Sequence, residues 1–238
     1  MRFYRPLSPV RAMTFDLDDT LYDNRPVMDK TEEEVIAFIR QYDPRFSELP
    51  ADYINVFRDR IRRQQPEIFH DVSRWRLLSW RTFFLHYGYT AARAQAGADA
   101  VMAHFAQWRS RIDVPQSTHD TLTALAARIP LVAITNGNME PEKCGLADYF
   151  TFILKAGPDG RAKPFCDMYR TAAQRLALPA ENILHVGDNL NTDVEGALCS
   201  GMQACWINLD GRDVYHDPET RLLPHIEITQ LDSLTGLL

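Results

Sequence analysis

The sequence contains no hydrophobic run of the length that crosses a bilayer. Of its 238 residues, 45% are hydrophobic and 24% are charged, and no unbroken apolar stretch approaches the roughly 18 to 20 residues that a membrane-spanning helix needs. Residues 1–6 also lead into no apolar segment of the kind that signal peptides contain. We therefore expect a protein that neither binds a membrane nor is secreted.

Cysteine is scarce, and positive charge is not in excess. The cysteines form no Cys-x-x-Cys pair and no zinc-ligand spacing with histidine, which predicts free thiols in a reducing cytoplasm. The 26 basic residues are outnumbered by 32 acidic ones, giving a net charge of −6. Because phosphate backbones attract basic surfaces, we expect no nucleic-acid partner. The four cysteines are Cys144, Cys166, Cys199 and Cys205.

Short apolar runs that alternate with helical patterns predict an α/β fold. Helices are expected at residues 165–176 and 194–200 between the later runs. Strands that alternate with helices form a parallel sheet covered on both faces, and ligands bind beyond the carboxyl ends of its strands. The expected strands are residues 12–17, 131–135, 152–154, 183–186, 204–207 and 226–229.

A long helical block separates the first expected strand from the second. Residues 24–116 carry 14 basic and 12 acidic residues, whereas the rest of the chain carries 12 basic and 20 acidic ones. The block is too long for a simple crossover, so we predict an inserted cap at 24–116 and a core formed by 1–23 and 117–238. Apolar positions recur at helical spacing in residues 31–40, 52–65, 72–87 and 91–110.

Two carboxylates lie at the end of the first expected strand. Asp16 and Asp18 lie two residues apart, so they can face the same side of an extended segment, and Thr20 lies two residues after Asp18. Converging carboxylates repel one another unless a cation or a proton lies between them. In isolation, this pattern is more typical of an acidic turn than of a catalytic site.

Hydrogen-bond donors end the second expected strand, and a lysine follows in a later loop. Thr135 and Asn136 precede Gly137 and offer side-chain and backbone donors suited to a phosphate. An ordinary Asn-Gly turn would explain the same residues. Lys163 precedes Pro164 and, taken alone, would be interpreted as a surface charge.

A second acidic pair follows the strand at residues 183–186. Asp188 comes directly after Gly187, and a carboxylate that ends a buried strand must be paired, hydrated or bound to a metal. Asp193 could instead cap a helix that begins at Val194. Hard oxygen ligands with no nearby histidine or cysteine cluster suit Mg²⁺ better than zinc. His185, inside the apolar strand, is expected to be a hydrogen-bonded core residue.

The order of these residues resembles the haloacid dehalogenase-like (HAD) hydrolase superfamily. The resemblance implies a Rossmann-like α/β core with a parallel sheet and an inserted all-helical C1-type cap. It implies that Asp16 is a nucleophile that forms an aspartyl-phosphate, and that Asp18 protonates the departing alcohol and then activates water. The matching residues are Asp16, Asp18 and Thr20 (DxDxT), Thr135, Lys163, and Gly187, Asp188 and Asp193 (GDxxxxD).

The same resemblance assigns the binding roles. Mg²⁺ would be held by the carboxylates of Asp16 and Asp188 and by the backbone carbonyl of Asp18. Asp193 would orient Lys163 or a water on the metal. The phosphoryl oxygens would be bound by Thr135, Asn136 and Lys163.

Four stretches resemble an enterobacterial family of 5-amino-6-(5-phospho-D-ribitylamino)uracil phosphatases. This resemblance implies a small phosphorylated metabolite of riboflavin biosynthesis as partner, with FMN and other phosphate esters also accepted. The presence of Asp18 favours phosphate chemistry over dehalogenation, because a halide leaving group needs no acid. The stretches are residues 1–7, 14–27, 108–116 and 200–207.

Three other functions are compatible with parts of the pattern. A phosphotransferase or phosphomutase shares the aspartyl-phosphate step and differs only in what attacks the intermediate. A non-catalytic phosphate-binding protein could keep the fold, but no residue of the constellation is missing here. A signalling receiver domain has no room for the inserted block. The sequence does not predict an oligomeric state.

Overall fold

A seven-stranded sheet forms the centre of the computed structural model, which describes all 238 residues. The strand order is β1-β7-β6-β5-β2-β3-β4, and every neighbouring pair is parallel except β1 with β7. The predicted parallel sheet is therefore confirmed. The antiparallel edge strand was not predicted, since two residues carry no periodicity. The strands are Arg2–Phe3 (β1), Ala12–Phe15 (β2), Leu131–Thr135 (β3), Phe152–Lys155 (β4), Ile183–Gly187 (β5), Gln203–Ile207 (β6) and Ile226–Ile228 (β7).

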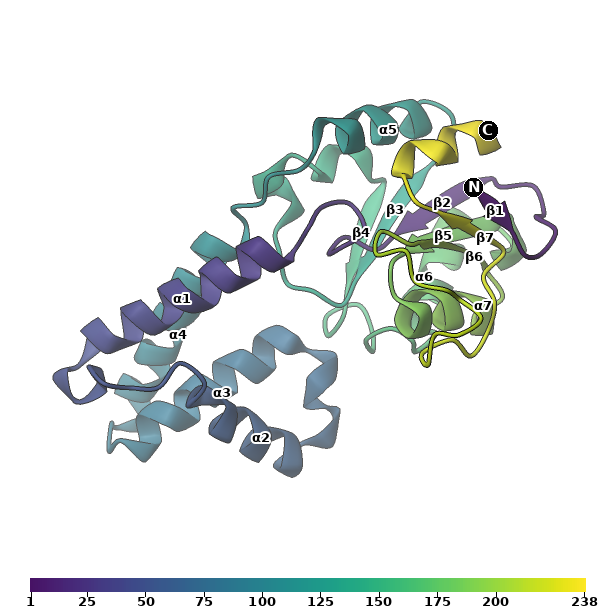
Figure 1. Cartoon of the computed structure of the whole chain (residues 1–238). Helices are drawn as coiled ribbons and strands as arrows, with labels where there is room; N and C mark the ends of the chain where they lie inside the picture. Colours follow the sequence, from purple (N-terminus) through teal and green to yellow (C-terminus); the bar gives the residue numbers. More distant parts are fainter.

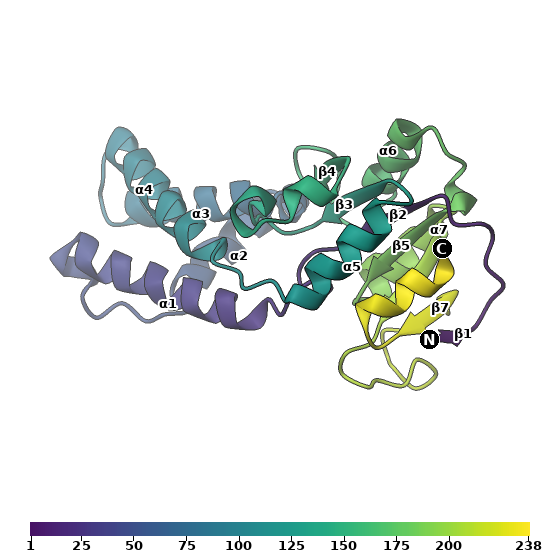
Figure 2. The ribbon, with the colours of Figure 1, turned by 90° about the horizontal axis from the view of Figure 1, so that it is seen from above.

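Helices cover both faces of this sheet, as Figures 1 and 2 show. One face packs against α5 (Gln116–Ala126) and the C-terminal 3₁₀ segment Leu231–Leu237, and the other against α6 (Asp167–Leu176) and α7 (Gly196–Cys199). Side chains along a strand point alternately to the two faces, so both sets of strand positions are apolar. Met13 belongs to the first hydrophobic cluster and Ala12 to the second.

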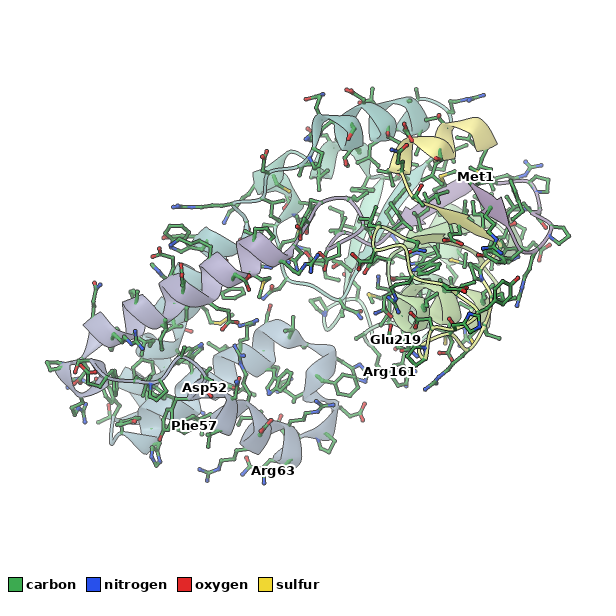
Figure 3. All side chains as sticks on the ribbon, in the orientation of Figure 1. Met1, Asp52, Phe57, Arg63, Arg161 and Glu219 are labelled. Carbon is green, nitrogen blue, oxygen red and sulfur yellow. The ribbon has the colours of Figure 1, made fainter.

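Residues between β2 and α5 form a helical module that extends away from the sheet (Figure 1). It has its own hydrophobic core, in which Trp80, Phe83 and Phe84 are buried. Figure 3 places Phe57 and Arg63 on this module. Gly97 is required for close packing here, because a Cβ atom would lie 2.7 Å from the Phe84 ring. The helices are Arg25–Tyr42 (α1), Ile54–Gln64 (α2), Val72–His86 (α3) and Ala91–Arg109 (α4).

Several predicted helix bounds differ from the structure, three of them in ways that bear on the argument. The first helix begins at Arg25 rather than residue 31, with a proline in its first turn, where a missing N–H costs nothing. The helix expected from residue 165 begins at Asp167. The helix expected at 194–200 begins earlier, as a π-helical turn at Leu190–Glu195.

That early start removes the capping role considered for Asp193. The Asn189 side chain caps the turn by accepting hydrogen bonds from the backbone N–H groups of Asn191 and Thr192, both at 2.9 Å. Asp193 lies inside the turn and is buried. Its carboxylate must therefore be used elsewhere.

Two expectations from composition can be compared with the structure directly. None of the helices combines the length and the apolar character that crossing a membrane requires. All four cysteines are unpaired, as predicted.

Candidate active site

The candidate site lies where three neighbouring strands end. β2 pairs with β3 on one side and with β5 on the other, all parallel, so their carboxyl ends share one edge of the sheet. Asp16 follows β2, Thr135 ends β3, and Asp188 follows β5. We call this edge the carboxyl edge. Residues that are far apart in the sequence meet there because of the strand order.

Asp16, Lys163 and Asp193 form a buried charged cluster at this edge. Lys163 Nζ donates to Asp16 Oδ1 at 2.7 Å and to Asp193 Oδ1 at 2.6 Å. Burial raises the pKa of Asp16, and the Lys163 ammonium opposes this effect. Burial also disfavours the charged lysine, but the two carboxylates outweigh it and raise the pKa of Lys163. The lysine is therefore a fixed cation beside Asp16.

The Asn136 side chain holds the backbone of the lysine loop. Its Oδ1 accepts from the Lys163 backbone N–H at 2.7 Å, and its Nδ2 donates to the Lys163 carbonyl at 3.0 Å. The side-chain amide is thus engaged with the loop, a role that the sequence did not reveal. Thr135 Oγ1 accepts from the Gly137 N–H at 2.9 Å, which leaves its own hydrogen available for a ligand.

A chain of buried polar groups supports Asp193. Its Oδ1 contacts His185 Nε2 at 3.2 Å, and its Oδ2 accepts from the Asn189 N–H at 3.0 Å. Thr14 Oγ1 lies 2.8 Å from His185 Nδ1. Burial lowers the pKa of His185, so a neutral ring donates from Nε2 and accepts at Nδ1. His185 is the hydrogen-bonded core residue that the sequence predicted.

Hydrogen-bond donors also keep the Asp193 carboxylate ionised. Burial raises the pKa of this carboxyl, but Lys163 and His185 together hold it well below its usual range. Gly187 makes room for it, because a Cβ at residue 187 would lie 2.3 Å from Asp193 Cγ. This close approach gives a physical reason for the glycine of the Gly-Asp pair.

Three carboxylates converge at the carboxyl edge. One oxygen each from Asp16, Asp188 and Asp193 lie within 4.8 Å of one another. Burial raises the pKa of Asp188 to about 7, and the charges of Asp193 and Asp19 add to this shift. When all three are ionised, Lys163 neutralises one charge of three. A divalent cation with oxygen ligands would balance the remaining two, so the donor set fits such an ion.

The Asp18 side chain is held by its own set of hydrogen-bond donors. Arg109 Nη2 contacts its two carboxylate oxygens at 2.6 and 2.8 Å, and the Tyr22 hydroxyl donates to Oδ1 at 2.6 Å. Gly137 lies against it, since a Cβ there would be 2.4 Å from Asp18 Oδ2. Arg109 is 2% exposed and comes from the end of α4, 91 residues along the chain. Sequence reasoning could list Arg109 among cationic residues of the inserted block but could not pair it with Asp18.

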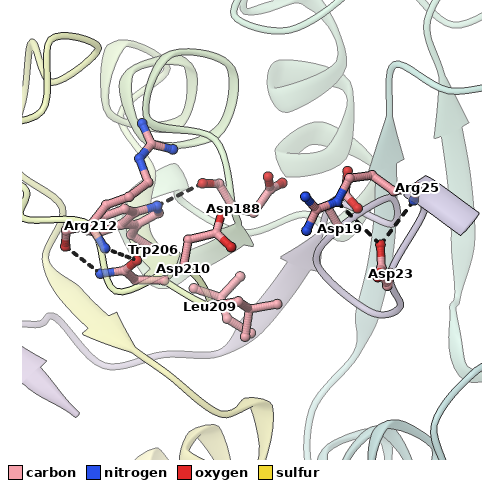
Figure 4. A pocket seen from close by; sticks show the side chains of 10 residues that line it. Asp19, Asp23, Arg25, Asp188, Trp206, Leu209, Asp210 and Arg212 are labelled. Carbon is pink, nitrogen blue, oxygen red and sulfur yellow. Dashed lines mark hydrogen bonds and ion pairs between the residues drawn. The ribbon is translucent and has the colours of Figure 1, made fainter.

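A pocket of about 430 Å³ opens beside Asp188 (Figure 4). Asp19, Arg25 and Leu209 are among the residues that line it. Trp206 Nε1 donates to the Asp188 carbonyl at 2.7 Å and so fixes the backbone that carries this carboxylate. The site is therefore open to solvent on the side of β6.

Comparison with known proteins gives concordant matches. A family model described as haloacid dehalogenase-like hydrolase matches residues 10–201. The chain is 56% identical over 238 residues, 100% of both proteins, to the 5-amino-6-(5-phospho-D-ribitylamino)uracil phosphatase YigB of Escherichia coli (strain K12). It is 27% identical to the N-acylneuraminate-9-phosphatase of Mus musculus, over 98% of this chain and 95% of that one. A solved 2-haloacid dehalogenase from Pseudomonas syringae pv. Tomato DC3000 matches with a TM-score of 0.90 and 31% identity, covering 96% of this chain and 97% of that chain.

Proposed function

The chain belongs to the haloacid dehalogenase-like hydrolase family and is a phosphoric monoester hydrolase, and we propose 5-amino-6-(5-phospho-D-ribitylamino)uracil as its substrate. The family that the motifs predicted is thereby confirmed. The name of the full-length E. coli relative supports the substrate, and FMN and other small phosphate esters are proposed as further substrates. The four unpaired cysteines support a cytoplasmic location as part of the same proposal.

Asp16 is the proposed nucleophile. Lys163 occupies Oδ1, which leaves Oδ2 free to attack phosphorus. A bond forms between Asp16 and phosphorus while the bond from phosphorus to the ester oxygen breaks, giving an aspartyl-phosphate. Water then attacks phosphorus, releases inorganic phosphate and restores the Asp16 carboxylate. The buried cluster of Asp16, Lys163 and Asp193 is the observation that carries this proposal.

Asp18 is the proposed acid and base. It gives a proton to the departing ester oxygen in the first step and takes one from the attacking water in the second. Both contacts of its carboxylate, from Arg109 and Tyr22, come from hydrogen-bond donors. These donors occupy both carboxylate oxygens and so fix the orientation of the side chain through which the proton is transferred.

The remaining polar groups bind the phosphoryl oxygens and a metal ion. Lys163 Nζ, Thr135 Oγ1 and the backbone N–H of Asn136 are the proposed phosphate ligands. The carboxylates of Asp16 and Asp188 and the backbone carbonyl of Asp18 would hold Mg²⁺, which supplies positive charge opposite the transferring phosphoryl group. Asp193 orients Lys163 in this proposal, consistent with their 2.6 Å contact.

The helical module, residues 24–116, is the proposed cap, and 1–23 with 117–238 the proposed core. The contact of Arg109 with Asp18 supports this division, because it brings the end of α4 to the carboxyl edge. A cap that closes over the substrate excludes water other than the one that reacts. A phosphotransferase or mutase would share every residue discussed so far and would differ in the acceptor admitted by the cap.

Phosphate release from a panel of esters tests the function. The panel contains 5-amino-6-(5-phospho-D-ribitylamino)uracil, FMN, pyridoxal phosphate and sugar phosphates, each with Mg²⁺ or EDTA. We expect release that EDTA abolishes, that Asp16→Asn lowers by at least about 1,000-fold, and that Asp29→Asn, at an exposed residue of α1, leaves unchanged.

The outcomes distinguish the chemistry from the substrate. Normal turnover by Asp16→Asn would exclude the nucleophile. Transfer of phosphate to an added sugar in preference to water would identify a transferase. A higher kcat/KM for another ester would overturn the flavin-pathway substrate while leaving the chemistry intact.

A further inference from the structure

His70 joins the helical module to the loop that carries Lys163. It ends the 3₁₀ segment Pro66–His70 between α2 and α3, and it is 7% exposed. Its Nδ1 accepts a hydrogen bond from the backbone N–H of Ala162 at 3.1 Å. Apart from contacts of Asn24, Arg25 and Gln116 at the connections, the side-chain hydrogen bonds between module and core are this bond, those from Arg109 to Asp18, and the one that Ser110 Oγ accepts from the Glu140 N–H at 3.4 Å.

The contact requires a neutral imidazole. His70 Nε2 lies 3.1 Å from Glu67 Oε2, so the tautomer with its hydrogen on Nε2 donates to Glu67 and leaves the Nδ1 lone pair for Ala162. A protonated ring carries hydrogen on both nitrogens. It would present an N–H to the N–H of Ala162, and the contact would be lost.

The loop around Ala162 is packed tightly against the module. The rings of His70 and Phe165 meet edge to face with centroids 4.9 Å apart. Gly157 adopts φ +94°, and a Cβ there would lie 2.7 Å from the Asp71 side chain. Ala162 is itself buried, so in this structure its N–H depends on His70 for a hydrogen-bond partner. A shift of the module on this side must therefore move the loop.

Lys163 follows Ala162 directly, and its backbone is clamped by Asn136. The segment is thus held from the core side at residue 163 and from the module side at residue 162. Phe165 N–H donates to the Ala162 carbonyl at 3.1 Å and closes the turn. The position of the Lys163 ammonium between Asp16 and Asp193 depends on both attachments.

We propose that His70 is a positioning residue that acts through Ala162 on Lys163. In its neutral form it seats the helical module against the lysine loop and keeps the ammonium beside Asp16. Protonation releases this attachment, so activity falls in acid through the module as well as through the catalytic carboxylates. The inference rests on the proposed role of Lys163.

Charged groups from both sides face the ring. The module contributes Glu67, Asp71 and Arg74, and the loop contributes Arg161 and Asp167, which pair with each other at 2.8 Å. Figure 3 shows Arg161 at the edge of the core. These groups line an open groove of about 530 Å³, through which protons can reach His70. Glu67 is 80% exposed, so solvent screens its attraction for a protonated ring.

Two substitutions distinguish the hydrogen-bond acceptor of His70 from the packing of its ring. His70→Phe keeps a ring against Phe165 but removes the acceptor, whereas His70→Asn keeps an acceptor oxygen that has no titratable proton. We expect His70→Phe to lower kcat about tenfold with little change in KM, and His70→Asn to stay within about threefold of wild type. His86→Asn, at an exposed histidine of α3, is the matched control. Thermal melting confirms that each variant is folded.

The pH profile and amide exchange supply independent readouts. As pH is lowered, wild-type activity should fall relative to that of His70→Asn, whose acceptor oxygen carries no titratable proton, and the two curves should converge at high pH. At neutral pH, the Ala162 amide should exchange slowly in wild type and His70→Asn and faster in His70→Phe.

Parallel pH profiles for wild type and His70→Asn would overturn the inference, as would equal amide exchange in all three proteins. If His70→Phe does not fold, the pH profiles of wild type and His70→Asn still test the inference. A wild-type protein that hydrolyses no ester but shows the expected exchange pattern would refute the proposed function and leave the contact standing.

Discussion

The carboxyl edge of the sheet and the helical module are stabilised in different ways. At the carboxyl edge, charged groups are buried in contact with one another, as Lys163 is with Asp16 and Asp193. In the module, aromatic side chains such as Phe83 and Phe84 fill the interior. The module reaches the edge through two polar side chains, Arg109 and His70. Buried charges are thus concentrated at the strand ends, and the module contacts this part of the core through a few residues that are distant in the sequence.

Lys163→Met tests the charged region and should have the largest effect. It removes the only cation from between two buried carboxylates, and breaking a buried ion pair costs about 3 to 5 kcal/mol of stability. Urea denaturation in EDTA measures this loss, and phosphate release should disappear as well. Lys143→Met, at an exposed lysine paired with Glu140, should change neither. Equal stability of Lys163→Met and wild type would show that the cluster is not held by charge.

Phe83→Ala tests the aromatic region. Phe83 is fully buried between Phe46, Phe57 and Trp80, so truncation leaves a cavity and should cost about 3 kcal/mol or more. Amide exchange should quicken in α3 and α4 but not in β2 and β5, because the two regions have separate hydrophobic clusters. Exchange that quickens equally in both would mean that module and core unfold as one unit. Phe69→Ala, at a partly exposed ring, is the control.

Arg109→Ala tests the contact between the two regions. Without the guanidinium, Asp18 keeps only the Tyr22 hydroxyl and loses its fixed orientation, so we expect kcat/KM to fall about 10- to 100-fold. Arg109→Lys should recover part of the loss, since a lysine can supply one donor but not the planar fork. Arg111→Ala, exposed two residues further on, is the control. Unchanged turnover in Arg109→Ala would show that this contact between module and core does not contribute to catalysis.

The contrast between the carboxyl edge and the helical module also explains which site residues the sequence could place. The residues of the carboxyl edge follow short apolar strands, and parallel strands bring their carboxyl ends together, so Asp16, Thr135 and Asp188 could be placed from the pattern alone. Lys163 sits in a loop, so its place at this edge followed only from the family resemblance, and its contact with Asp16 was not predicted. The pattern predicted the fold class but not the strand order, which places β2 between β5 and β3.

Other features of the site depend on tertiary contacts that leave no pattern in the local sequence. Arg109 ends a helix that the periodicity predicts, whereas His70 lies in a 3₁₀ segment between two predicted helices, and no local pattern identifies the partner of either residue in the core. Asn136 suggested a turn or a phosphate ligand, and only the fold shows that its side chain binds the Lys163 backbone. The π-helical turn before α7 arises from the Asn189 cap and the buried Asp193, both set by neighbouring strands.

The smallest predicted effect concerns Glu32, an acidic residue of α1 that pairs with two arginines of the module. Glu32 accepts from Arg76 at 3.0 Å and lies 3.5 Å from Arg58. Burial raises the pKa of Glu32, but the two arginines more than offset it, so the net shift is downward. A lowered carboxyl pKa stabilises the folded state above the unfolded value, and this contribution is lost as pH falls through the folded pKa.

Glu32→Gln should therefore lower stability at pH 7 by only about 0.5 kcal/mol, because solvent screens a side chain that is 43% exposed. In urea denaturation, the difference between variant and wild type should shrink toward zero as pH is lowered below about 4, where the carboxyl of unfolded chains becomes protonated. A loss that grows in acid would reverse the sign of this linkage. A loss at pH 7 as large as that of Lys163→Met would mean that ion pairs stabilise the module as strongly as the carboxyl edge, and the contrast between the two regions would fail.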